Sequence, residues 1–193
     1  MSLMRNAVLL CAAIILSACA YGTDDKYASD TEVAKFQHVS QEQPYLMLMT
    51  MISNKSGRGG HSSLVINGSQ TVMYDPAGRW FNSHAPERHD LLYGINDNIL
   101  QLYRSFHARD THHVVSQKIY VTPEIAEQAL AAAKAQGRAL DATCAINTIA
   151  ILNQLEGFQG VKSTYFPEKL MKRFGELPNV QTDKYFENDT GKN

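Results

Sequence analysis

The amino-acid sequence predicts an α+β domain in which a small antiparallel sheet is packed with helices. Patterns typical of strands lie between residues 45 and 121, and patterns typical of helices follow from residue 122 onwards. The two kinds of element do not alternate, as they would in a doubly wound parallel fold. An apolar content of 44% with 19% charged residues is enough to build one buried core.

The strand predictions rest on apolar runs that end at turn residues. Residues 45–52 form a compact apolar run, which is typical of a buried strand. Residues 61–66 and 71–74 flank Asn67-Gly68, a strong hairpin signal, so we expect two paired strands with their turn centred there. Asp75-Pro76 then ends the second strand. Residues 116–121 are a further strand candidate.

Three helices are predicted from their start and stop signals. Thr122 can cap a helix that Pro123 opens, and the pattern continues through residue 135 until Gly137 stops it. A second helix is expected to begin within residues 141–144 and to run to residue 155. A third is expected to open at Pro167 and to end near Gly175.

The N-terminus has the pattern of an export signal. A short basic start is followed by an apolar run over residues 7–16, which is too short to span a bilayer comfortably. The Leu-Ser-Ala-Cys sequence that ends at Cys19 resembles the bacterial lipobox, which implies cleavage before Cys19 and lipidation of that residue. Ala20 in the next position implies sorting to the outer membrane. An uncleaved membrane helix is the alternative.

These signals divide the chain into four parts. Residues 1–18 are the expected lipoprotein signal peptide, and residues 19–43 are expected to be a lipidated cysteine with a flexible, polar tether. The folded domain is expected over residues 44–186, and a polar tail over residues 187–193. The net charge of −1, with no run of basic residues, gives no electrostatic footprint for nucleic acid.

Cys144 is the strongest candidate for a chemical role. The other two of the three cysteines lie at positions 11 and 19, so Cys144 would be the lone free thiol of the mature chain. It falls where a helix is expected to start, and the unpaired N–H groups there favour a thiolate and could hold an oxyanion. The alternative is a small core residue, since buried cysteines are common.

A cysteine nucleophile needs a base, and His61 is our candidate because it starts a strand behind a glycine-rich stretch. If the hairpin turns at Asn67-Gly68, His61 lies near Tyr74 and therefore close to Asp75. Asp75 could then fix the imidazole tautomer and stabilise the imidazolium. A structural strand-end role for His61 and a turn role for Asp75 stay open.

The order of these features resembles a known family. A strand-borne histidine in residues 60–66, a cysteine opening a helix in residues 143–147 and a proline-led helix in residues 165–170 are similar to the circularly permuted branch of the NlpC-type papain-like hydrolases. That branch includes relatives of lecithin:retinol acyltransferase. The resemblance implies a permuted papain-like fold, with His61 before Cys144 in the chain, and a cell-wall peptide amide or an acyl ester as substrate.

The insert over residues 80–113 carries no motif of that family. Tyr93, Tyr103 and Phe106 within it are expected to pack or to line a substrate cleft. Its end holds a cluster of metal-ligand types whose spacing matches no standard site, so a solvated loop is favoured over a zinc site; the cluster consists of His107, Asp110, His112 and His113.

Two functions therefore compete. The first is a lipid-anchored cysteine hydrolase that uses Cys144, His61 and Asp75 and needs no metal or organic cofactor. It would face the periplasm from the outer membrane, with peptidoglycan or an acyl lipid as its substrate. The second is a non-catalytic outer-membrane lipoprotein that uses the same fold to bind a cell-wall fragment or a partner protein.

Overall fold

The computed structural model describes residues 27–187. The expected signal peptide, Cys19 and all of the expected tail except Glu187 lie outside this range. Within it, the α+β class is confirmed: one seven-stranded antiparallel sheet, in the order β4-β5-β3-β2-β1-β6-β7, is packed with helices. The strands are β1 (Tyr45–Ser53), β2 (Gly59–Asn67), β3 (Thr71–Tyr74), β4 (Glu87–Arg88), β5 (Leu91–Leu92), β6 (His112–Tyr120) and β7 (Gln181–Tyr185).

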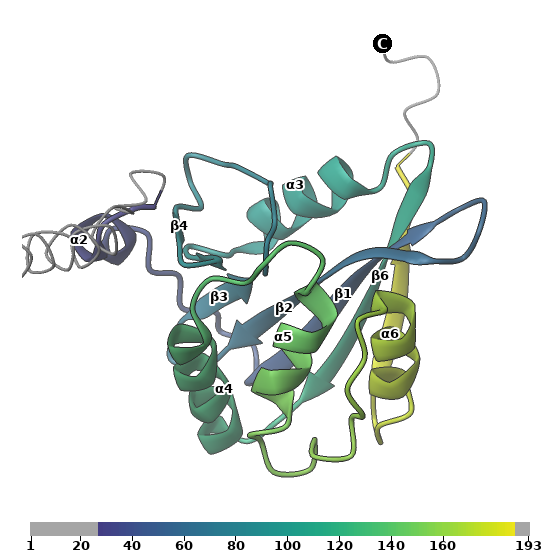
Figure 1. Cartoon of the computed structure of the whole chain (residues 1–193). Helices are drawn as coiled ribbons and strands as arrows, with labels where there is room; N and C mark the ends of the chain where they lie inside the picture. Colours follow the sequence, from purple (N-terminus) through teal and green to yellow (C-terminus); the bar gives the residue numbers. More distant parts are fainter. Residues whose placement is uncertain (1–26, 188–193) are drawn as a thin grey trace, which may run out of the picture.

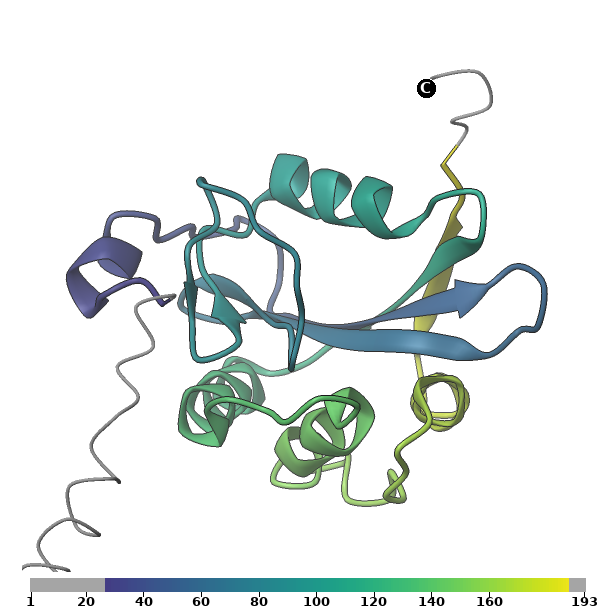
Figure 2. The same cartoon turned by 45° about the horizontal axis from the view of Figure 1, so that its top comes forward.

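The five described helices are divided between the two faces of this sheet. Figure 2 shows α3 (Asp97–His107) on one face and α4 (Pro123–Gln136), α5 (Cys144–Leu152) and α6 (Pro167–Gly175) on the other. A short helix, α2 (Asp30–Ala34), lies beside β4 at the edge of the sheet (Figure 1). No helix within residues 27–187 is both long and apolar enough to cross a lipid bilayer.

The central strand β1 is buried on both faces, which explains its continuous apolar run. Side chains alternate along a strand, so Leu46 and Leu48 join the core beneath α4, α5 and α6. Met47 and Met49 join the second core, beneath α3. The flexible methionine side chains fill the irregular space between the sheet and this single helix.

The hairpin of β2 and β3 forms, but its register differs from the sequence-based prediction. Asn67 pairs with Thr71, so the connection is the three residues 68–70 rather than a tight turn centred on Asn67-Gly68. Tyr74 consequently faces Leu64 and lies farther from His61 than predicted. The side chain of Asn67 stabilises this wider loop, because its oxygen accepts a hydrogen bond from the Thr71 hydroxyl at 2.8 Å.

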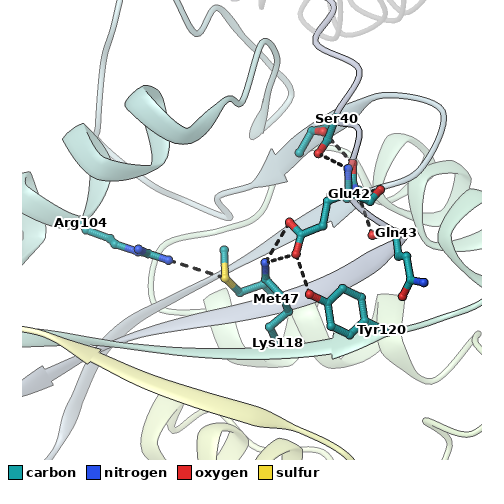
Figure 3. A network of polar contacts seen from close by, with 9 residues as sticks. Ser40, Glu42, Gln43, Met47, Arg104, Lys118 and Tyr120 are labelled. Atoms are coloured by element: carbon teal, nitrogen blue, oxygen red, sulfur yellow. Dashed lines mark hydrogen bonds and ion pairs between the residues drawn. The ribbon is translucent and has the colours of Figure 1, made fainter.

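Part of the expected tether lies among the described residues. Ser29 caps α2, and Val33 of that helix is 6% exposed within the core. Farther along, the Lys118 ammonium lies 2.8 Å from Glu42 and the Tyr120 hydroxyl donates to the same carboxylate at 2.7 Å (Figure 3). Residues 30–43 thus include a helix and contacts with the sheet, and the flexible tether over residues 19–43 stays a prediction.

The helix signals were largely correct. The Thr122 side chain accepts a hydrogen bond from the Ile125 N–H group, Pro123 opens α4, and Gly137 follows it with a φ of 67°. Helix α6 also opens at its proline, as predicted. Helix α5 is shorter than expected: Cys144 is its first residue, and it ends at Leu152 rather than at residue 155.

Candidate active site

The site lies where the short strand β3 leaves part of β2 without a neighbour. Strand β3 pairs only with residues 64–67 of β2, whereas β1 pairs with β2 along its whole length. Residues 59–63 therefore have a strand on one side only. This part of β2 lies between the α3 layer and the α5 layer of the molecule (Figure 2).

His61 and Asp75 are in direct contact. The Nε2 atom of His61 lies 2.6 Å from Oδ1 of Asp75, and their side chains are 19% and 4% exposed. Asp75 reaches the histidine from the turn that follows β3, even though the strand register differs from the one predicted. His61 pairs with Met51 of β1 and shares its face of the sheet, which is the α3 face.

Cys144 comes to the same imidazole from the opposite layer. Helix α5 packs on β2, and its first residue places the Cys144 thiol close enough to His61 for each group to shift the pKa of the other. Because Asp75 occupies Nε2, the other ring nitrogen, Nδ1, is left for the thiol. Ser62, the next residue of β2, also lies near the thiol and lowers its pKa, although the buried Ser62 hydroxyl has no hydrogen-bond partner within residues 27–187. The three residues selected from the sequence are thus joined in one chain of contacts.

Electrostatics favour an ion pair between the cysteine and the histidine. Burial alone would lower the pKa of His61, but the charge and hydrogen bond of Asp75, together with Cys144, raise it to about 10. Burial raises the pKa of the Cys144 thiol. The neighbouring His61 and Ser62 together lower it by a larger amount, so the net shift of this pKa is downward. The site therefore favours a thiolate beside an imidazolium.

Tyr103 is a fourth member of the site that the sequence did not reveal. Its hydroxyl donates to Oδ1 of Asp75 at 2.7 Å, and its side chain is fully buried. Burial and the neighbouring carboxylate raise the pKa of Tyr103, so the hydroxyl stays protonated and remains a donor. Burial would raise the pKa of Asp75, but the charge of His61 and these hydrogen bonds keep it below its ordinary value.

The histidines at the end of the insert lie in two different places, one beside the site and the others on β6. His107 ends α3 and stacks on His61, with the ring centroids 6.2 Å apart. Its Nδ1 atom donates to the Tyr103 carbonyl at 2.9 Å. Burial lowers the pKa of His107, so the ring is neutral near pH 7. His112 and His113 instead lie on β6, and His113 contacts Asn54 at 2.7 Å.

Two further findings concern the alternatives drawn from the sequence. Residues 27–187 contain no group of three or more histidine, cysteine, aspartate or glutamate side chains arranged to hold a metal ion. Cys144 is also buried, with 7% exposure, as the core interpretation expects. The lowering of its pKa by the neighbouring His61 distinguishes it from a cysteine that merely fills apolar space.

A helix signal inside the insert could have identified Tyr103. Asn96 caps α3 by accepting a hydrogen bond from the Ile99 N–H group at 3.0 Å. Ile99, Leu100 and Tyr103 then follow at the spacing of one buried helix face. That pattern predicts the helix and the burial of Tyr103, but it does not show that the hydroxyl reaches Asp75.

Comparison of the chain with protein-family models, with curated proteins and with solved structures found no significant match.

Proposed function

We propose that this protein is a cysteine hydrolase in which Cys144 is the nucleophile, His61 the general base and acid, and Asp75 the residue that orients the imidazole. One arrangement carries this proposal: the His61 imidazole contacts the buried Asp75 carboxylate at 2.6 Å through Nε2, and the thiol of Cys144, the first residue of α5, lies close enough to shift the pKa of the same imidazole. This is the arrangement that thiol acyl transfer requires.

In the proposed reaction the Cys144 thiolate attacks the carbonyl carbon of an amide or ester. The first N–H groups of α5 have no partner within the helix, and they can stabilise the negative oxygen of the tetrahedral intermediate. His61 donates its proton to the departing amine or alcohol as the carbon–nitrogen or carbon–oxygen bond breaks. Water, deprotonated by His61, then attacks the thioester and releases a carboxylic acid together with the free thiol.

The proposed fold is the permuted papain-like one of the NlpC-type hydrolases. The order of His61 before Cys144, the antiparallel sheet and the proline-led helix α6 support it. The proposed substrate is a cell-wall peptide amide or an acyl ester. The lipobox pattern at Cys19 supports a protein that is lipid-anchored in the outer membrane and faces the periplasm.

A binding module on the same fold is the second candidate. The observation that favours it is the burial of Cys144, because a reacting thiol must be reached by its substrate. A binding protein would keep the buried contacts for stability and would not need an activated thiol.

Alkylation of Cys144 by iodoacetamide separates the two candidates. A hydrolase should react at pH 7 at least about tenfold faster than a free thiol of pKa about 8.5, because more of its thiol is ionised. His61→Ala should abolish that advantage. His113→Ala is the matched control, since it removes an imidazole outside the site. Reaction at the rate of a free thiol, unaffected by His61→Ala, would refute the hydrolase.

A further inference from the structure

Asp90 is a buried carboxylate that takes no part in the chain of contacts from Tyr103 to Cys144. It lies in the two-residue turn between β4 and β5 and is 3% exposed. Its backbone is in the left-handed region, with a φ of 62°, as is that of His89 beside it, with a φ of 52°. Aspartate, asparagine and glycine tolerate this conformation better than other residues do.

On one side, Asp90 holds the turn that carries Asp75. The carbonyl oxygen of Asp90 accepts a hydrogen bond from the Asp75 N–H group at 2.8 Å. Its carboxylate oxygen Oδ2 accepts a second one from the Ala77 N–H group at 2.7 Å. These two bonds fix the backbone before and after the Cα atom of Asp75, from which its side chain extends to His61.

On the other side, the same oxygen holds the loop that leads to the nucleophile. Oδ2 of Asp90 accepts a hydrogen bond from the Ala139 N–H group at 2.9 Å. The next residue, Leu140, accepts one through its carbonyl from the Thr143 N–H group at 3.2 Å. Thr143 immediately precedes Cys144 and holds the N-cap position of α5, without a capping hydrogen bond from its side chain. A short series of backbone bonds therefore runs from Asp90 to the start of that helix.

We propose that Asp90 is a positioning residue that sets the placement of the Cys144 thiol relative to the Asp75–His61 pair. This inference rests on the proposed thiol chemistry. One oxygen bonds both loops, so they cannot separate without breaking a charge-assisted hydrogen bond in a buried setting. Asp90 acts on the site through the backbone of the two loops, while its other carboxylate oxygen, Oδ1, accepts a hydrogen bond from the Tyr27 hydroxyl at 3.1 Å.

The test compares two variants that both accept a positive φ. Asp90→Gly removes the carboxylate, whereas Asp90→Asn keeps an acceptor oxygen of the same reach. The measurement is the rate of Cys144 alkylation by iodoacetamide between pH 5 and 10. With glycine, the apparent pKa of the thiol should move up toward about 8.5 and the rate at pH 7 should fall about tenfold or more. Asparagine should restore most of the wild-type profile.

Asn67→Ala is the matched control for lost stability. Asn67 is also a buried polar residue that ties two segments together, and its amide donates to the Gln43 carbonyl at 3.1 Å. It lies at the far end of β2 from His61, so its removal should lower the unfolding free energy and leave the alkylation profile unchanged. If Asp90→Gly does not fold, Asp90→Ser is used in its place. The serine side chain is shorter than that of aspartate and cannot reach both loops.

The outcomes separate this inference from the proposed function. A wild-type profile in Asp90→Gly, alongside a slow His61→Ala variant, would overturn the positioning role and leave the hydrolase intact. A shift of equal size in Asn67→Ala would overturn it too, because the effect would then follow from stability alone. A wild-type protein that reacts like a free thiol would overturn both.

Discussion

Replacing Tyr103 with phenylalanine should destabilise the protein more than the same change at Tyr74. Both side chains are fully buried, so neither substitution changes ring packing, and each removes one hydroxyl. The Tyr103 hydroxyl donates to a buried carboxylate at 2.7 Å, whereas that of Tyr74 donates to the neutral Gly137 carbonyl at 3.2 Å. The two variants therefore compare a charged with a neutral acceptor.

The expected magnitudes follow from the acceptors. A hydrogen bond to a charged group contributes about 2 kcal/mol to the unfolding free energy, and one to a neutral carbonyl about 1 kcal/mol. For a domain of this size, Tyr103→Phe should lower Tm by about 4–8 °C and Tyr74→Phe by about 2–4 °C. Thermal unfolding followed by circular dichroism at pH 7 measures both changes.

A double-mutant cycle isolates the charge. In an Asp75→Asn background the acceptor is neutral, so Tyr103→Phe should lower the unfolding free energy by only about 1 kcal/mol. Equal losses for Tyr103→Phe and Tyr74→Phe, or no coupling between Tyr103 and Asp75, would refute the contribution assigned to this buried hydrogen bond.

Two further predictions concern pH and space at Asp75. The pKa of His61 is raised to about 10, so its contribution to stability is complete below about 6.5 and is lost as the pH rises through 10. In a Cys144→Ala background, where Cys144 no longer raises this pKa, urea unfolding should show the decline at a lower pH than in the wild type, and His61→Gln should remove it; a parallel decline in both would contradict the assignment. Gly78→Ala should slow alkylation of Cys144 about tenfold, because the added methyl group would overlap the Asp75 carboxylate. Gly160→Ala, where the space is open, should leave the rate unchanged, and an unchanged rate in Gly78→Ala would show that Asp75 tolerates displacement.

Local signals predicted much of the fold. The apolar run of β1, the bounds of β3 and the start of α4 and α6 were predicted closely, because each depends on neighbouring residues in the chain. The two-residue strands β4 and β5 were missed, since two residues show no periodicity. Strand β7 is exposed along most of its length and has no apolar alternation to detect.

The site could be predicted only in part. Cys144 was identified by its place at a helix start, and the contact of His61 with Asp75 was inferred from the hairpin. The predicted register was wrong, yet the contact forms, because the side chain of Asp75 extends from a turn rather than from the strand. Asp90 was missed because three of its four hydrogen-bond donors are backbone groups, which no residue pattern reveals.

The open edge of β2 also has a consequence for folding. His61 belongs to one layer and Cys144 to the other, so neither layer alone holds all residues of the proposed site. While the chain is unfolded, Cys144 is an ordinary, mostly protonated thiol. The lowered pKa of the Cys144 thiol thus depends on the folded arrangement, which brings His61 and Cys144 together from the two layers.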